Sequence, residues 1–265
     1  MEIPIPNSLS PSKVSSFTSC PLAFRLRSID SLQEPRSPQA LKGTLVHSAL
    51  EGLFWSHPAG ARSKDAARFE LELAWSATVD DDDFKELGLS DESSSEFFFD
   101  AWALVQNYYL LEDPDAVHEI GVELGISIEL SGTLLRGIID RLDLDGDGNF
   151  VVVDYKTGRT PPQRFVGASL IGVHLYALMC EEILGRQPVE VRLLYLRDPV
   201  VLTTRPTAQS LRGHRRRTLA VWNAIERSCA TGEFKPHRSP LCKACHFKPL
   251  CPEFGGTPPA PPPVT

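Results

Sequence analysis

The fold of this chain is constrained most by two apolar, β-branched segments, 134–144 and 150–156, that flank a turn of Gly, Asp and Asn. This pattern predicts a β-hairpin. Within its strands, Asp140 and Asp154 stand where apolar side chains are expected. Lys156 follows Asp154 by two residues, so the alternation of a strand places both side chains on one face.

Burying two acids and a lysine costs several kcal/mol unless the charges bind a partner. A divalent cation shared by Asp140 and Asp154, with Lys156 beside it, would offset that cost. Such a site suits the hydrolysis of a phosphodiester, because a metal ion stabilises the negative charge that develops on the phosphoryl oxygens. The hairpin therefore predicts a metal-dependent phosphodiesterase site.

The spacing of these residues resembles that of the PD-(D/E)XK nucleases, in which acid-x-Lys follows an earlier aspartate. Gly-Ile-Ile-Asp-Arg at 137–141 and Val-Asp-Tyr-Lys-Thr-Gly at 153–158 are similar to the RecB-like branch. That branch includes AddB-type helicase–nuclease subunits and the nucleases of CRISPR adaptation. The resemblance implies an α/β fold, with a mixed sheet flanked by helices and a helical insertion.

The same resemblance implies a function in DNA repair or recombination. The expected activity is that of a stand-alone deoxyribonuclease that uses Mg²⁺ or Mn²⁺ and acts as an exonuclease on single-stranded DNA ends. Asp140 and Asp154 would hold the metal ion. Lys156 would position the attacking water and stabilise the developing negative charge. A helicase or CRISPR-adaptation partner is expected by the same resemblance.

The acids around the turn allow a second interpretation. Asp143, Asp145, Asp147, Gly148 and Asp154 fall at positions 1, 3, 5, 6 and 12 of an EF-hand calcium loop. An EF-hand needs a helix on each side, whereas the flanking segments here are strand-like, and the last ligand would be Asp rather than Glu. A solvated hairpin turn is therefore the preferred interpretation.

Further metal ligands follow from the resemblance. Residues 43–47, Gly-Thr-Leu-Val-His, resemble a Gly-x-x-x-His motif whose histidine approaches the metal ion, so His47 is a candidate ligand. A strand predicted over 119–130 carries Glu123 and Glu129, of which Glu123 is favoured. The alternative for Glu123 is an exposed strand carboxylate. The carbonyl of Tyr155 would complete the shell.

A helix is predicted over 165–184, where the family carries Gln-x-x-x-Tyr. Tyr176 matches the tyrosine, but Gly172 stands at the glutamine position, and His174 is the nearest polar residue. Tyr176 and His174 are candidate substrate contacts. The missing glutamine keeps open a different function, that of a catalytically silent DNA-binding or scaffolding subunit of a helicase–nuclease or CRISPR-adaptation complex.

The net charge of −7 argues mildly against nucleic-acid binding, but residues 80–100 hold nine acids and one lysine, and the remainder is near neutral. A helix predicted over 207–232 contains the most basic stretch, including Arg212, Arg215 and Arg216. These arginines form either an ordinary solvated helix face or a sequence-independent contact to phosphates.

Cys242, Cys245 and Cys251 form C-x2-C-x5-C, which supplies three thiols where a tetrahedral site or a cubane needs four. Cys20, also followed by proline, is the expected fourth. This frame resembles the iron–sulfur staple of AddB-type and CRISPR-adaptation nucleases, which implies a [4Fe–4S] cluster that ties the chain ends together. Zinc, with His246 replacing one thiolate, is the alternative. The remaining cysteines are expected to be buried on helices: Cys180 and Cys229.

A chain of 265 residues can bury a substantial core in one domain. No apolar run is long enough to span a membrane, and no secretory signal is visible, so a cytoplasmic location is expected. Residues 27–41 are interpreted as a loop. The expected organisation is a single nuclease domain over 1–254 and a disordered Pro-rich tail over 255–265. Its parts are a helical part at about 10–115, an α/β core at about 117–232, and a cysteine segment, 233–254, joined to Cys20.

Overall fold

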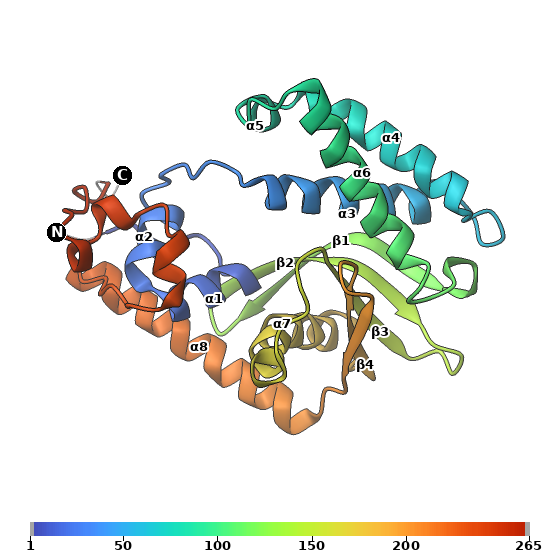
Figure 1. The fold of residues 1–265 in the computed structure, drawn as a ribbon. Helices are drawn as coiled ribbons and strands as arrows, with labels where there is room; N and C mark the ends of the chain where they lie inside the picture. The colour runs from blue at the N-terminus through green and yellow to red at the C-terminus, as the bar shows by residue number, and fades with distance from the viewer. Residues whose placement is uncertain (1–2, 263–265) are drawn as a thin grey trace.

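A mixed sheet in the order β1-β2-β3-β4-β5 forms the centre of the computed structural model, which describes residues 3–262 (Figure 1). Neighbouring strands are antiparallel except β3 and β4, which are parallel. Parallel strands need a crossover connection, and α7 supplies it. The expected α/β class is confirmed. The strands are β1 (Glu119–Leu130), β2 (Thr133–Leu144), β3 (Phe150–Lys156), β4 (Glu190–Tyr195) and β5 (Val200–Thr204).

Helices cover both faces of the sheet, as Figure 1 shows. One face packs against α1 (Pro11–Ser19), α2 (Pro21–Ser28), α7 (Val166–Leu184) and α8 (Ala208–Thr231). On the other face α3 (Pro38–Ser56) packs on β1, and α4 (Lys64–Asp80), α5 (Asp82–Lys85) and α6 (Asp91–Tyr108) form a helical layer with it. Short 3₁₀ turns connect or follow these elements: η1 (Pro114–Ala116), η2 (Gln163–Phe165), η3 (Pro240–Ala244), η4 (Lys248–Leu250) and η5 (Pro252–Phe254).

The apolar run of β3 explains why this strand lies at the centre. Val152 packs with the α7 side, whereas Val151 and Val153 pack with the α3 side. A strand buried on both faces is apolar throughout rather than alternating. No helix among residues 3–262 is both long and apolar enough to cross a membrane.

Serine caps set the starts of several helices. Ser10, Ser37, Ser63 and Ser90 each accept a hydrogen bond from a backbone N–H three residues later, a contact that contributes about 1 kcal/mol. Ser37 begins α3 at Pro38, so the loop expected up to residue 41 ends earlier.

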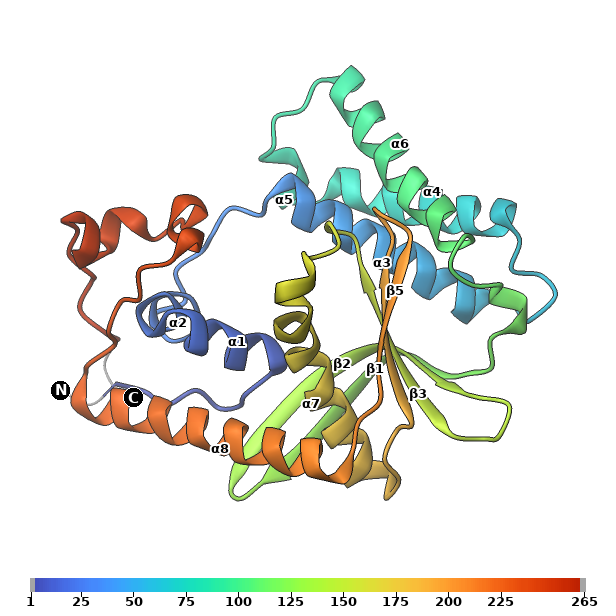
Figure 2. The ribbon, with the colours of Figure 1, turned by 60° about the horizontal axis from the view of Figure 1, so that its bottom comes forward.

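The expected hairpin is confirmed. In its turn, Asp145 Oδ1 accepts hydrogen bonds from the backbone N–H groups of Asp147 (2.9 Å) and Asn149 (2.8 Å). Because the segments on either side are the strands β2 and β3, the EF-hand interpretation is excluded. Figure 2 shows the β1–β2 hairpin extending beyond the rest of the sheet, beside α7 and α8.

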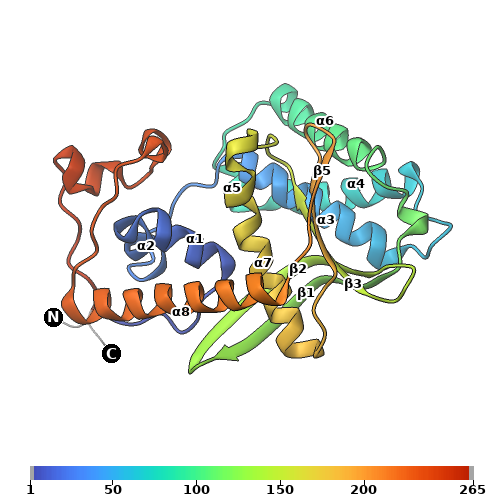
Figure 3. The ribbon, with the colours of Figure 1, turned by 90° about the horizontal axis from the view of Figure 1, so that it is seen from below.

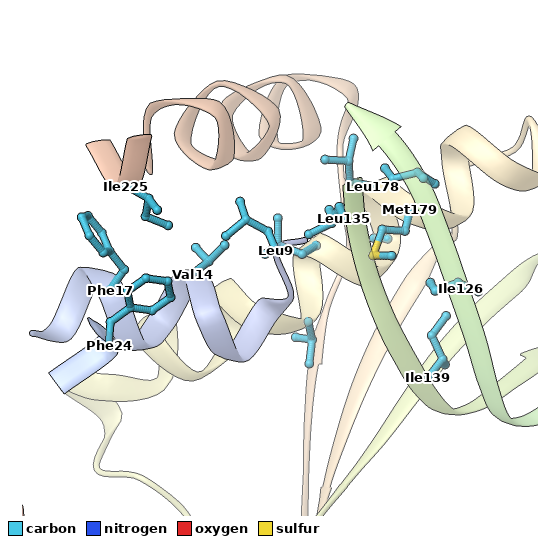
Figure 4. Packing of buried hydrophobic residues seen from close by; sticks show 14 of the residues in the cluster. Leu9, Val14, Phe17, Phe24, Ile126, Leu135, Ile139, Leu178, Met179 and Ile225 are labelled. Carbon is cyan, nitrogen blue, oxygen red and sulfur yellow. The ribbon is translucent and has the colours of Figure 1, made fainter. Parts of the chain in front are cut away.

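The two ends of the chain lie side by side. Ile3 N–H donates to the carbonyl of Cys229 at the end of α8 (3.1 Å), and Leu9 forms a parallel bridge with Leu135. Figure 3 shows both termini at the C-terminal end of α8, next to α1 and α2. In this region the rings of Phe17 and Phe24 meet edge to face, with centroids 5.3 Å apart, near Ile225 (Figure 4).

Candidate active site

The two predicted acids lie where β2 and β3 separate. The pairing of these strands runs from Leu144 and Phe150 to Arg141 and Val153, and ends there. Asp140 on β2 and Asp154 on β3 are the first residues beyond this last pair, where the two strands have separated. The backbone N–H of Tyr155 donates to Asp140 Oδ2 (2.7 Å). The carboxylate therefore accepts the hydrogen bond that a backbone carbonyl of a paired strand would otherwise accept. The fork places the two acids close enough for the charge of Asp154 to raise the pKa of Asp140, but Asp154 is outside the group of ligand atoms formed by His47, Glu123 and Asp140.

His47 and Glu123 join Asp140 from two other elements, α3 and β1. One ligand atom from each of the three residues lies within 4.8 Å of the others. His47 Nδ1 is 3.6 Å from Asp140 Oδ2 and 3.9 Å from Glu123 Oε1, while its Nε2 is 3.2 Å from the carbonyl of Tyr155. With the proton on Nε2 donated to that carbonyl, Nδ1 presents its lone pair to the acids. Imidazole nitrogen and carboxylate oxygen are ligands that suit a divalent cation.

The backbone at Glu123 is strained. Its φ of 45° lies in the left-handed region, which few residues other than glycine adopt. Its neighbours Val122 and Leu124 pair with Arg141 and Ile139, so Glu123 lies opposite Asp140. Such conformations cluster at functional sites, where the surrounding structure holds them. The register supports Glu123 over Glu129, which pairs with Leu134 far from the acids.

Asp154 is buried and paired with Lys156. Lys156 Nζ forms an ion pair with Asp154 Oδ2, an oxygen buried from solvent, at 2.5 Å. Burial on its own lowers the pKa of Lys156, but the charge of Asp154 and a hydrogen bond to it outweigh this and raise the pKa. Lys156 is therefore a cation at neutral pH, and it neutralises part of the charge of the buried Asp154 carboxylate.

The pKa shifts of Asp140 and His47 also favour a bound cation at this site. Burial raises the pKa of Asp140 to about 6, the charge of Asp154 adds to the rise, and His47 and the Tyr155 N–H oppose it. Burial lowers the pKa of His47, but a hydrogen bond to Glu123 and the charges of the nearby acids raise it on balance. A divalent cation would lower the electrostatic free energy of these gathered carboxylates.

Behind the acids lies a buried polar network that the sequence analysis missed. The guanidinium of Arg141, with 0% exposure, makes a bidentate pair with Asp143 (2.8 and 2.9 Å). Its Nη1 donates to the hydroxyls of Tyr155 (2.7 Å) and Tyr108 (3.2 Å), and lies 2.7 Å from Glu112 Oε1. The signal was an arginine in the middle of a buried strand, directly after Asp140.

Of the predicted substrate contacts, Tyr176 lines the cavity that contains His47, Glu123 and Asp140. Burial raises the pKa of its hydroxyl, and the nearby acids add to the rise. His174 instead lies 2.8 Å from His214 and 3.1 Å from the hydroxyl of Thr204.

The α8 arginines lie elsewhere. Arg215 pairs with Glu182 of α7, and the described residues that line the cavity around the acids include none from α8. A role for Arg212, Arg215 and Arg216 in substrate binding stays a prediction.

The cysteines of the predicted frame lie in segments near the two ends of the chain, and backbone N–H groups donate to two of their sulfurs. Cys20 lies between α1 and α2, where its sulfur accepts a hydrogen bond from the backbone N–H of His237 (3.5 Å). The sulfur of Cys242 accepts one from Ser239 N–H (3.4 Å). Burial raises the pKa of Cys245, the backbone of Phe247 opposes this through a hydrogen bond, and Cys20 and Cys242 add to the rise.

Burial and spacing further characterise these cysteines. Cys20, Cys245 and Cys251 are partly buried against the hydrophobic cluster that includes residues of α1 and α8, and all the cysteines are free thiols. Backbone hydrogen bonds to sulfur are a feature of iron–sulfur sites. Within residues 3–262, no three of these sulfurs lie within 4.8 Å of one another, so the cysteines do not form an assembled metal site there. Cys180 and Cys229 are buried, as predicted.

A mixed sheet with an acid at a strand fork and an acid-x-Lys strand end beside it defines a class of nuclease. The sequence matches the model of the PD-(D/E)XK nuclease superfamily over residues 8–252, and the chain belongs to this superfamily. It is 26% identical over 271 residues to the Gene 69 protein of Mycobacterium phage D29, an alignment that covers 92% of this chain and 96% of that protein.

The fold is also similar to a crystal structure from Eubacterium rectale, of a protein called "Putative exonuclease". The TM-score is 0.54 at 13% identity, with 98% of this chain and 91% of the other covered. At that identity the likeness concerns the fold.

Proposed function

We propose that this chain is a metal-dependent deoxyribonuclease of the RecB-like branch that acts as an exonuclease on single-stranded DNA ends. One observation carries the proposal: His47, Glu123 and Asp140 converge within 4.8 Å of one another, next to the Asp154–Lys156 pair. Superfamily membership supports phosphodiester hydrolysis. The name of the Eubacterium rectale protein supports cleavage from an end.

The donor set suits Mg²⁺ or Mn²⁺, held by Asp140 and Asp154 with His47, Glu123 and the Tyr155 carbonyl. Such an ion supplies Lewis acidity and positive charge at the reacting phosphate. Lys156, kept protonated by Asp154, donates hydrogen bonds that orient the attacking water and stabilise the developing negative charge. The hydrogen bond from the Tyr155 N–H fixes the orientation of the Asp140 carboxylate.

The terminal cysteines are proposed to hold a [4Fe–4S] cluster on Cys20, Cys242, Cys245 and Cys251, in preference to zinc. The cluster would act structurally, because its ligands come from both ends of the chain and its binding free energy would add to folding free energy. The proposed setting is cytoplasmic DNA repair or recombination, with a helicase or CRISPR-adaptation partner.

The test of catalysis is cleavage of an end-labelled single-stranded oligonucleotide with Mn²⁺. Asp154→Ala and Lys156→Ala should each lower the rate by at least about 100-fold, the scale of losing one stabiliser of transition-state charge. Asp147→Ala, in the exposed turn, is the matched control and should cleave normally.

A silent scaffolding subunit, which Gly172 favours, makes the opposite prediction. In that case the wild-type protein binds DNA and Mn²⁺ but does not cleave with any divalent metal. Normal cleavage by Asp154→Ala or Lys156→Ala would also contradict the proposed mechanism.

A further inference from the structure

A second cavity adjoins the acids along the β1–β2 hairpin. We call it the hairpin pocket, and its lining includes Ser12, Gly125, Gly137, Ile138 and Tyr176. Its volume is ≈ 580 Å³, within the range of about 300–1,000 Å³ for ligand sites. Ile138 and Tyr176 also line the cavity around Asp140, so the two cavities adjoin at these side chains. Whatever is bound at the acids can extend into the hairpin pocket.

The walls of the hairpin pocket are apolar and shaped by glycines. Gly125 pairs with Ile138 across the strands, and no atom lies within 4 Å of where its Cβ would stand. A Cβ at Gly137 would come within 2.7 Å of the Tyr176 ring, so glycine lets the ring lie against the strand. Ile138 is 54% exposed at the edge of this space. An aliphatic side chain, an aromatic ring and open glycine backbone fit a flat ring with apolar faces.

One cation, Arg136, lines the hairpin pocket, and a second, Lys13, lies near Arg136. Lys13 follows the lining residue Ser12. Burial lowers the pKa of Lys13, and the charge of Arg136 lowers it further, so the two side chains are neighbours. In the described part of the chain neither forms an ion pair with a carboxylate, although Lys13 Nζ donates to the carbonyl of Ser8 (3.0 Å). Two adjacent unpaired cations suit a phosphate.

The distance along β2 between the acids and the two cations suits one short segment of nucleic acid. Arg136 and Asp140 are four residues apart on β2, which is about 14 Å at a rise of about 3.4 Å per residue. Ile138 lies midway between them. A short extended segment of single strand that places one phosphate at the acids and another at Lys13 and Arg136 passes over the hairpin pocket between the two.

We propose that the hairpin pocket binds an unpaired nucleobase next to the scissile phosphate, while Lys13 and Arg136 bind a phosphate further along the same strand. This inference rests on the proposed function and deepens it. A base in a duplex is stacked and paired, so it cannot enter the pocket. The pocket would therefore select single-stranded DNA.

The first test measures base binding apart from cleavage. An oligonucleotide carrying 2-aminopurine is bound to the wild-type protein in Ca²⁺, with the probe moved one position at a time. Emission should fall when the probe occupies the pocket position and stay unchanged several nucleotides away. Gly125→Leu fills the open space without left-handed strain and should abolish the fall. Gly146→Leu, in the exposed β2–β3 turn, is the control and should retain it.

The second test uses kinetics and salt. In Mn²⁺, removing the base at the pocket position should raise KM roughly 5- to 100-fold, the range for loss of one base–aromatic stack. Arg136→Gln and Lys13→Gln should each reduce the slope of log affinity against log salt by about 1.

The outcomes separate this inference from the proposed function. If wild-type protein cleaves but Gly125→Leu and the abasic substrate behave as wild type, the pocket assignment is wrong and the nuclease stands. If wild-type protein does not cleave, the proposed function fails, and the fluorescence test still decides the pocket. Failure to bind any oligonucleotide, or equal emission changes at every probe position, overturns the inference.

Discussion

Replacing Arg141 by methionine should destabilise the protein strongly. The guanidinium is fully buried and serves two carboxylates, those of Asp143 and Glu112, and two phenol hydroxyls. Methionine fills a similar space without charge, so the buried Asp143 would lose its bidentate partner and Glu112 its ion pair, with the charge of Arg192 remaining near Asp143. Removing one partner of a buried ion pair costs about 3–5 kcal/mol. This loss would be a large fraction of a typical unfolding free energy of about 5–15 kcal/mol.

The loss should depend on pH. Burial already raises the pKa of Asp143, and Arg141 now opposes that rise. Without Arg141 the pKa of folded Asp143 rises further above its unfolded value, and a raised carboxyl pKa lowers stability as pH increases. The variant should therefore be most destabilised near pH 8 and recover part of the loss towards pH 5. In the Arg141→Met variant, the additional change Asp143→Asn should also recover part of the lost stability at pH 8.

Urea unfolding followed by circular dichroism measures this difference. Arg192→Met is the matched control, because Arg192 is 37% exposed and pairs with Glu190 near the surface, so its loss should cost about 1 kcal/mol or less. If Arg141→Met unfolds within about 1 kcal/mol of wild type at pH 8, the network does not carry the stability assigned to it.

Three further predictions concern the metal ion, α7 and the cysteines. Because the pKa of Asp140 is about 6, Mn²⁺ should raise the melting temperature clearly at pH 7.5 and little at pH 5 in scanning calorimetry, and an equal rise in Asp140→Asn would contradict this. Gly172→Gln should raise the free energy of unfolding by up to about 1 kcal/mol, since a Cβ at this position meets no atom within 4 Å. The variant should also cleave faster in Mn²⁺, and slower cleavage would argue against a role for glutamine at this position. Cys20→Ser should remove the iron–sulfur absorption of anaerobically purified protein and lower its melting temperature, whereas Cys180→Ser should do neither. A colourless wild-type protein that holds one zinc ion would refute the cluster.

The hairpin could be predicted because its signals are local. The strand expected over 150–156 is β3 itself, and the one expected over 134–144 begins one residue earlier in β2. Period-2 alternation also placed Lys156 beside Asp154 correctly. His47 meets the acids as the resemblance implied, although no local pattern shows that α3 would reach the fork.

The parts that could not be predicted depend on contacts between distant segments or on unusual backbone. Glu112 follows α6 and meets Arg141 through space, which no periodicity reveals. The left-handed conformation of Glu123 breaks the simple alternation of β1 at the site itself. The start of α3 at Pro38 did have a local signal, because serine followed by proline is typical of a helix start.

The joined chain ends have a consequence for how the protein is made. His237 and Cys20, which share a hydrogen bond, are 217 residues apart. At about 5–20 residues per second, the first two helices leave the ribosome some 10–40 s before the segment that covers them. During that time Phe17 and Phe24 lack the α8 side chains that they pack against in the finished protein. The amino-terminal helices therefore reach their final packing only when synthesis is nearly complete.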